Sequence, residues 1–311
     1  MGQIITVSHE ITAQNSASLS NSFLNFLDTP SKRTIETYRR ALKRLFDFFS
    51  LRRITEPQRA DILTYKRSLE ADGLKNTTIS TYIAVVRLFF RWTAQEGIYP
   101  NIADHIKGEK ISRDHKKDYL TAAQASDILK GIDTTTAGGK RDFAIVILMT
   151  VCGLRTIEVA RADIEDIRTA GDKTVLYLQG KGRTDKGDFV ILPEVVEKAI
   201  REYMKTRKDA KGSDPLFTSC SRNNAGGRMT TRAISGIAKK SMTAAGYTSE
   251  RLTAHSLRHT AVTLALIGGA SLQEAQQFAR HSDISTTTIY AHNLEKMRNT
   301  CADTIASALA I

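Results

Sequence analysis

The stretch AHSLRHT, residues 254–260, holds two histidines and an arginine that would share one face of a helix. His255 lies three residues before Arg258 and four before His259, the spacing of neighbours on a helix surface. Two kinds of site fit this pattern. A zinc ion needs neutral imidazoles and is repelled by a guanidinium, whereas a phosphate accepts hydrogen bonds from both arginine and histidine. The seven residues alone leave both open.

The charge of the chain favours a polyanionic partner. The formal net charge of the 311 residues is +12, and the isoelectric point is near 9.6. Residues 1–110 carry 16 Lys and Arg against 11 Asp and Glu, and residues 111–311 carry 29 against 22, so both halves are basic. This distribution indicates binding of a nucleic acid by both halves. A generally basic protein without such a partner is the alternative.

Other features of the composition argue against membrane and secreted classes. No apolar run approaches the roughly 18 residues of a membrane span, and the N-terminus lacks the pattern of a signal peptide. The three cysteines, Cys152, Cys220 and Cys301, are scattered without CxxC spacing, which is typical of reduced thiols. We therefore expect a cytoplasmic, nucleoid-associated protein that makes no membrane contact.

Hydrophobic periodicity predicts a mainly α-helical fold with a small antiparallel β-sheet. In a first domain, residues 15–106, amphipathic helices are predicted over 34–50, 61–71 and 77–97. Residues 107–119 are polar and basic without apolar periodicity, which indicates a linker. Residues 120–311 form a second domain of helices with two strands within 174–193 and a last helix from about Leu294 to Ala310.

Four segments of the second domain carry side chains whose chemistry is complementary. GLRTIEVA places Arg155 at a helix start with Glu158 one turn on, and LQGKGR places a lysine on the hairpin. HSLRH contributes two histidines and an arginine to the candidate set, and RHSDISTTTIYAH contributes a histidine and a tyrosine. In chain order, the candidate set is Arg155, Glu158, Lys181, His255, Arg258, His259, His281 and Tyr290.

This ordered set resembles that of the tyrosine recombinases, the phage integrase family, in their simple two-domain form. The resemblance extends over about residues 118–295 and is weaker in the helical domain before them. It implies that the Tyr290 hydroxyl attacks a DNA phosphodiester, forms a 3′-phosphotyrosyl link and releases a 5′-hydroxyl. Because the bond energy is conserved, neither a metal, nor ATP, nor another cofactor is needed. Strand exchange would pass through a Holliday junction.

The resemblance also implies how the remaining charged groups act. Arg155 and Arg258 would bracket the non-bridging oxygens of the phosphate, where negative charge develops in the transition state. Lys181 matches the general acid that protonates the leaving 5′-oxygen.

The histidines and the glutamate of the set have supporting places in the same scheme. His255 matches a general acid/base near the nucleophile, and His281 a hydrogen-bond donor to the phosphate. Glu158 and His259 resemble residues that orient Arg155 and brace the pocket. The zinc alternative lacks an HExxH glutamate and has Arg258 on the same face, so a phosphate is the expected occupant.

One residue departs from the family pattern. The position before the second histidine is commonly glycine in these enzymes, whereas this chain has Arg280. A cation there would alter the approach of the helix to DNA or add a phosphate contact. The start of the chain is short, and we expect no extra arm-type DNA-binding domain before the helical one.

The family further implies a homotetramer on two DNA sites, with accessory directionality proteins in some systems. In the terminal helix, Met297, Cys301, Ile305 and Leu309 recur every four residues, and this apolar face would dock on a neighbouring protomer or pack on its own domain. Integration and excision of a mobile element, resolution of DNA multimers and inversion all remain open. A type IB topoisomerase-like activity is the nearest alternative. A DNA-binding protein without catalysis would have no need of Tyr290.

Overall fold

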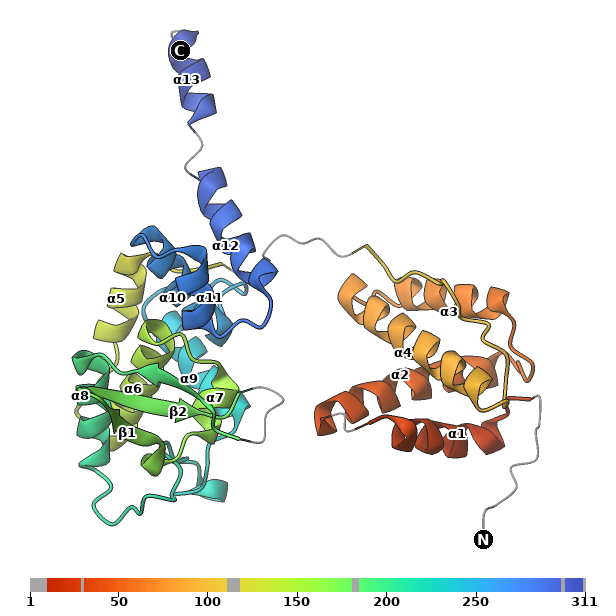
Figure 1. The fold of residues 1–311 in the computed structure, drawn as a ribbon, viewed down its shortest axis with the longest axis horizontal. Helices are drawn as coiled ribbons and strands as arrows, with labels where there is room; N and C mark the ends of the chain where they lie inside the picture. The colour runs from red at the N-terminus through yellow and green to blue at the C-terminus, as the bar shows by residue number, and fades with distance from the viewer. Residues whose placement is uncertain (1–9, 29–30, 111–117, 181–184, 298–299, 310–311) are drawn as a thin grey trace. The chain divides into compact units, whose positions relative to one another are not determined.

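The computed structural model describes residues 10–28, 31–110, 118–180, 185–297 and 300–309. The described residues divide into two compact units, one ending at residue 110 and one beginning at residue 118 (Figure 1). Helices form most of both units, and the second unit also contains a three-stranded antiparallel sheet. The predicted fold class, mainly α with a small antiparallel sheet, is confirmed.

Four helices form the first unit around an aromatic core. The ring of Phe89 lies edge-on to both Phe23 and Phe46, with ring centroids 5.6 Å apart in each pair. Such edge-to-face pairs add to the free energy gained by burying the rings. The helices are α1 (Ala13–Phe26), α2 (Lys32–Leu51), α3 (Arg59–Ala71) and α4 (Asn76–Gln95).

The first of these helices, α1, was not predicted, because its sequence is rich in polar residues. It begins at a capping box, in which the Thr12 side chain accepts a hydrogen bond from the backbone of Asn15 and the Asn15 side chain accepts one from the backbone of Thr12. Its buried apolar residues are Leu19, Phe23 and Leu24. The capping box is the local signal from which this helix could have been found.

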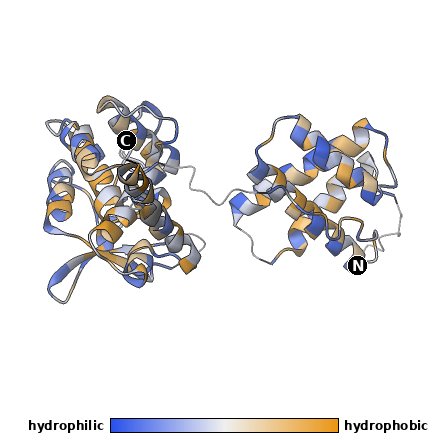
Figure 2. Ribbon diagram, turned by 90° about the horizontal axis from the view of Figure 1, so that it is seen from above, coloured by the Kyte–Doolittle hydropathy of each residue, from blue (hydrophilic) through white to orange (hydrophobic). Residues whose placement is uncertain are grey.

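At the centre of the second unit lies a helix whose C-terminal half is apolar on all sides. This helix, α6 (Ala137–Val151), has eight buried residues and packs against α8, α9 and α10. The helices around it show hydrophobic and hydrophilic residues on different faces (Figure 2). They are α5 (Ala122–Lys130), α7 (Thr156–Arg161), α8 (Glu194–Met204), α9 (Thr231–Ala244), α10 (Ala254–Ile267), α11 (Leu272–Ala279) and α12 (Ile284–Met297).

The sheet has the order β1-β2-β3, with both pairs antiparallel. The strands are β1 (Ile167–Ala170), β2 (Lys173–Leu178) and β3 (Asp188–Ile191). The central residue Leu176 is fully buried and pairs with Ile167 on one side and Val190 on the other. The hairpin of β2 and β3 was predicted, whereas the mostly exposed edge strand β1 was not.

The chain after Tyr290 corrects one prediction. A single helix was expected from Leu294 to Ala310, but α12 ends at Met297 and a separate helix, α13 (Cys301–Ala308), follows. The apolar series at intervals of four is therefore divided between two helices. No helix in the described part of the chain is both long and apolar enough to span a membrane.

Candidate active site

The first pair of site residues lies at the start of α7. Arg155 is the residue before the helix, and Glu158 reaches back to it from the first turn. The Glu158 carboxylate accepts hydrogen bonds from the backbone N–H of Arg155 at 2.8 Å and from its Nη1 at 2.7 Å. The Glu158 side chain is 1% exposed. A carboxylate at a helix N-terminus also interacts favourably with the helix dipole, so the local sequence fixes this pair.

Arg258 enters the same region from α10, and backbone carbonyls hold it. Its Nη1 donates to the carbonyl of Gly153 at 2.5 Å, and its Nη2 donates to the carbonyl of Ala279. The side chain is buried, and burial together with the nearby Arg155 and Arg280 guanidiniums lowers the pKa of Arg258. The lowered pKa, about 9, is still above neutral pH, so Arg258 stays a cation.

The turn that supplies the Gly153 carbonyl requires glycine. Gly153 has φ +62°, in the left-handed region, and a Cβ there would lie 3.1 Å from the ring of Phe278. This close approach brings the end of α6 against the end of α11. The turn is thus part of what positions Arg258.

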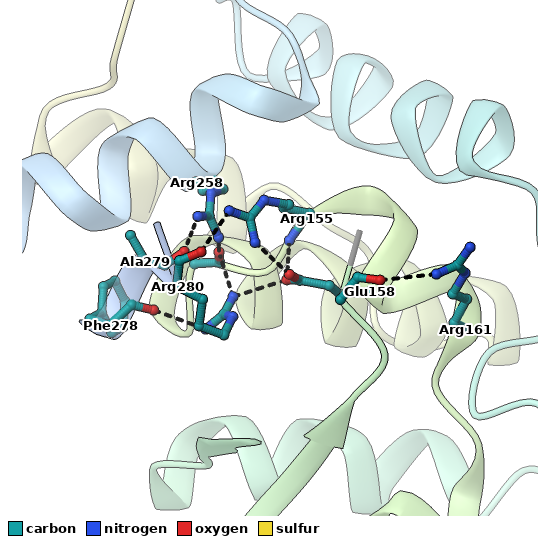
Figure 3. A network of polar contacts seen from close by, with 9 residues as sticks. Arg155, Glu158, Arg161, Arg258, Phe278, Ala279 and Arg280 are labelled. Atoms are coloured by element: carbon teal, nitrogen blue, oxygen red, sulfur yellow. Dashed lines mark hydrogen bonds and ion pairs between the residues drawn. The ribbon is translucent and has the colours of Figure 1, made fainter. Parts of the chain in front are cut away.

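Arg280, the departure from the family pattern, turns its side chain into the protein. It is the C-cap of α11 with φ +52°, and its Nη1 donates to the Phe278 carbonyl at 2.9 Å. Its Nη2 donates to Glu158 at 2.9 Å and to the Gly153 carbonyl at 3.2 Å. Figure 3 shows the three guanidiniums of Arg155, Arg258 and Arg280 gathered here, with Glu158 between Arg155 and Arg280.

Burial and charge act in opposite directions on Glu158. Burial alone would raise the pKa of the carboxyl, but the Arg280 guanidinium and the hydrogen bonds from Arg155 together outweigh it and hold the pKa below its usual value. Glu158 is therefore ionised at neutral pH. The cluster of Arg155, Glu158, Arg258 and Arg280 carries three positive charges and one negative.

His281, the residue after Arg280, is neutral at physiological pH. Burial, with the Arg258 and Arg155 guanidiniums next in effect, lowers its pKa to about 4. Its Nδ1 lies 2.9 Å from the Thr287 hydroxyl oxygen. A neutral ring that accepts the Thr287 proton at Nδ1 carries its own proton on Nε2, which can then donate to a phosphate oxygen.

Tyr290 lies on α12, buried beside two histidines. Its ring centroid is 4.4 Å from that of His259 and 6.2 Å from that of His281. Burial raises the pKa of the phenol, and the Arg258 and Arg155 guanidiniums oppose the rise. His259 is itself buried, and its ring also stacks on that of Tyr119, with the centroids 5.8 Å apart. With its pKa raised, the phenol of Tyr290 is protonated at neutral pH.

The two remaining residues of the predicted set are His255 and Lys181. His255 is exposed at the start of α10, while Arg258 and His259 of the same motif are buried, and its interaction with His281 contributes to the lowered pKa of that ring. Lys181 lies outside the described residues. Nearby, the Arg161 Nη1 donates to the carbonyl of Gly180 at 3.1 Å, at the end of the described part of the hairpin.

Lys186, shortly before β3, forms ion pairs with two aspartates. The Lys186 ammonium donates to Asp163 at 2.6 Å and to Asp166 at 2.5 Å. Asp163 also pairs with Arg228 at 2.5 Å. In the described part of the chain, no three His, Cys, Asp or Glu side chains are grouped so that they could hold a metal ion.

Several residues of this site were not predicted from sequence. The carbonyls of Gly153 and Ala279, the Thr287 hydroxyl and the Tyr119 ring all contact predicted residues. A glycine that breaks a buried helix was a visible signal for Gly153. Backbone acceptors and stacking partners from distant segments leave no signal in the spacing of residue types.

The sequence of the chain matches a known protein family in both units. Residues 118–297 match the phage integrase family, and residues 21–97 match the phage integrase N-terminal SAM-like domain. The chain belongs to the phage integrase family of tyrosine recombinases. The recombinase is 28% identical to a tyrosine recombinase XerD of Listeria innocua over 88% of this chain and 93% of the relative. It is 32% identical to a tyrosine recombinase XerC of Corynebacterium glutamicum over 71% of this chain and 69% of the relative.

Solved structures share the recombinase's fold at lower identity. XerH recombinase in a post-cleavage complex with a palindromic difH substrate aligns with a TM-score of 0.70 at 20% identity, over 97% of this chain and 91% of that one. A lambda integrase dimer bound to a COC′ core site aligns with a TM-score of 0.68 at 15% identity, over 87% and 96%. The recombinase therefore has the fold of these enzymes.

Proposed function

We propose that this tyrosine recombinase cleaves and rejoins DNA through a 3′-phosphotyrosyl link to Tyr290. The observation that carries the proposal is the placement of two guanidiniums beside a tyrosine. Arg258 and Arg155 donate to the carbonyls of the adjacent residues Ala279 and Arg280, and the ring of the next residue, His281, lies 6.2 Å from that of Tyr290. A phosphodiester placed there meets a nucleophile and two guanidiniums together. The Arg258 Nε is buried without an acceptor in the described residues, and a phosphate oxygen would supply one.

The proposed step is a nucleophilic displacement at phosphorus. The Tyr290 Oη forms a bond to phosphorus while the bond from phosphorus to the 5′-oxygen breaks. The 5′-oxygen takes a proton from Lys181, and His255 takes the proton of the phenol. A 5′-hydroxyl of the partner strand later reverses the step, and Tyr290 regains its proton.

The guanidiniums supply the electrostatic part of this scheme. Arg155 and Arg258 would hold the non-bridging oxygens as negative charge develops on them, and a neutral His281 would donate from Nε2. Glu158 would orient Arg155, and His259 would brace the ring of Tyr290. The scheme uses no metal ion, ATP or other cofactor.

We extend the proposal to the assembly on DNA. Domains comprising residues 15–106 and 120–311, joined by a linker, would both bind double-stranded DNA. Four protomers on two sites would exchange strands through a Holliday junction, with accessory proteins setting the direction. Ile305 in α13 is 59% exposed, and Leu309, the residue that follows the helix, is 63% exposed. This short helix therefore presents apolar surface for a neighbouring protomer. The cellular role would be integration and excision of a mobile element or resolution of DNA multimers, in the cytoplasm.

Covalent capture on a nicked substrate tests the nucleophile. Wild type, Tyr290→Phe and Tyr203→Phe are incubated in EDTA with nicked duplexes from the DNA flanking the gene, and adducts are resolved on a denaturing gel. Tyr203 is a matched control, since it is a buried tyrosine of the same unit, 3% exposed against 2% for Tyr290. We expect adducts with wild type and Tyr203→Phe and none with Tyr290→Phe. An adduct that survives Tyr290→Phe refutes the assignment.

A further inference from the structure

The conformation of Arg280 gives no reason for an arginine at this position. The residue ends α11 in the left-handed region, at φ +52° and ψ +47°, where glycine is the most favourable choice. Glycine is also common there in the family. The advantage of arginine at this site must therefore come from its side chain.

That side chain is committed to protein groups. It is 10% exposed, its two Nη atoms donate to Glu158 and to the carbonyls of Phe278 and Gly153, and only its buried Nε has no acceptor among the described residues. The Gly153 carbonyl is the same oxygen that accepts from Arg258. A guanidinium held by three acceptors inside the protein is poorly placed to contact DNA.

Arg280 acts on Arg155 by two routes. Its main-chain carbonyl accepts a hydrogen bond from the Arg155 Nη2 at 3.0 Å. Its side chain binds one oxygen of Glu158, whose other oxygen binds the Arg155 Nη1 at 2.7 Å. The Glu158 carboxylate is thus fixed between two guanidiniums. Its freedom to rotate away from Arg155 is lost.

We propose that Arg280 is a positioning residue, which orients the guanidinium of Arg155 through Glu158 and does not contact DNA. The inference rests on the proposed function of Arg155 as a phosphate-binding group. It differs from both expectations drawn from the sequence, an altered approach to DNA and an added phosphate contact.

Two substitutions separate the side chain from the backbone. Arg280→Asn removes the charge and suits the left-handed conformation, and Arg280→Lys keeps the charge without the planar fork. Arg53→Asn is a matched control for the release of backbone strain, because Arg53 has φ +54° but lies exposed in the first unit. Thermal unfolding of each variant establishes that it is folded.

DNA binding and cleavage are then measured on a site that wild type cleaves. For Arg280→Asn we expect an unchanged dependence of affinity on salt and a single-turnover cleavage rate lower by about tenfold to a hundredfold, since small misplacements of a catalytic group have effects of this order. Arg280→Lys should recover part of the rate. Loss of a phosphate contact would instead lower the slope of log affinity against log salt by about 0.9. That result overturns the proposal.

A double-mutant cycle tests the route through Glu158. If Arg280 acts through this carboxylate, Arg280→Asn has little further effect on the cleavage rate in a Glu158→Gln background. Effects that multiply in the double variant would show that Arg280 acts independently of Glu158, and they would overturn the proposal.

A measurement without DNA separates this proposal from the proposed function. Arg280 helps to hold the pKa of Glu158 low, so the stability of wild type relative to Arg280→Asn should be largest at pH 7 and should shrink at acidic pH, as Glu158 becomes protonated. The other groups facing this pair are Arg155, Arg258, His281 and the neutral thiol of Cys152, whose pKa burial raises to about 12. If wild type forms no adduct on any DNA, the proposed function fails. A difference in stability that does not vary with pH overturns the coupling of Arg280 to Glu158.

Discussion

The neutral state of His281 predicts a dependence of stability on pH that one substitution should remove. In the folded chain its pKa is lowered from 6.5 to about 4, whereas the unfolded chain keeps the ordinary value. At a pH between these two values, the His281 ring is protonated in the unfolded state and neutral in the folded state. Stability is therefore fully present above about pH 6.5 and falls as the pH approaches 4.

The size of the effect follows from the shift in pKa. A difference of about 2.5 pKa units corresponds to about 3 kcal/mol at 1.36 kcal/mol per unit. The ring is only partly buried, so solvent screening reduces this to about 1 to 2 kcal/mol. His281→Asn keeps a polar group near the Thr287 hydroxyl and does not titrate. The stability of wild type relative to this variant should fall by that amount between pH 7 and pH 4.5.

Urea unfolding followed by two signals measures this difference. The one tryptophan of the chain, Trp92, is buried in α4 of the first unit, so its fluorescence reports that unit alone. Circular dichroism reports the helices of both units. The fluorescence transition should be the same for wild type and variant at every pH, while the remaining dichroism transition should differ between them.

A second substitution controls for the loss of any histidine. His105 is exposed in the first unit, and His105→Asn should leave the second-unit transition at its wild-type position at every pH. If wild type and His281→Asn lose stability in parallel from pH 7 to 4.5, His281 has an ordinary pKa. The argument that it is a neutral donor would then be refuted.

Two further substitutions test the framework around the site by urea unfolding. Gly153→Ala should destabilise the second unit by about 1 to 2 kcal/mol, because it places a Cβ on a left-handed backbone 3.1 Å from the Phe278 ring, and an unchanged unfolding midpoint would show that the turn tolerates a side chain. Lys186→Met should destabilise it by about 1 to 2 kcal/mol, because the Asp166 carboxylate, 1% exposed, loses its cation. Lys205→Met, which breaks an exposed pair with Glu202, is the control and should have no measurable effect. Equal effects of the two lysine substitutions would contradict the argument from burial.

Local patterns allowed much of this molecule to be predicted from its sequence. The helices α2, α3 and α4 follow the apolar periodicity, because each buries one face. The contact of Glu158 with Arg155 follows from their spacing at a helix start. The family resemblance is confirmed by the match over residues 118–297, whereas the role of each site residue remains a prediction.

Features that depend on distant segments could not be predicted. The partner of Arg280 lies 122 residues earlier in the chain, and nothing in the local sequence reveals it. Strand β1 has a mostly exposed surface and hence no apolar alternation to detect. The prediction of one continuous last helix was wrong because periodicity alone does not show where α12 ends.

The two guanidiniums proposed to bind the phosphate differ in whether a substitution can remove the groups that hold them. Backbone carbonyls of Gly153 and Ala279 anchor the Arg258 guanidinium, and no change of a neighbouring side chain deletes a carbonyl. Arg155 has one such acceptor, the carbonyl of Arg280, but its other partner is the carboxylate of Glu158, which a single nucleotide change can remove. Accumulated substitutions should therefore shift the position of the Arg155 guanidinium and with it the activity. The Arg258 guanidinium should keep its position for as long as the path of the backbone is preserved.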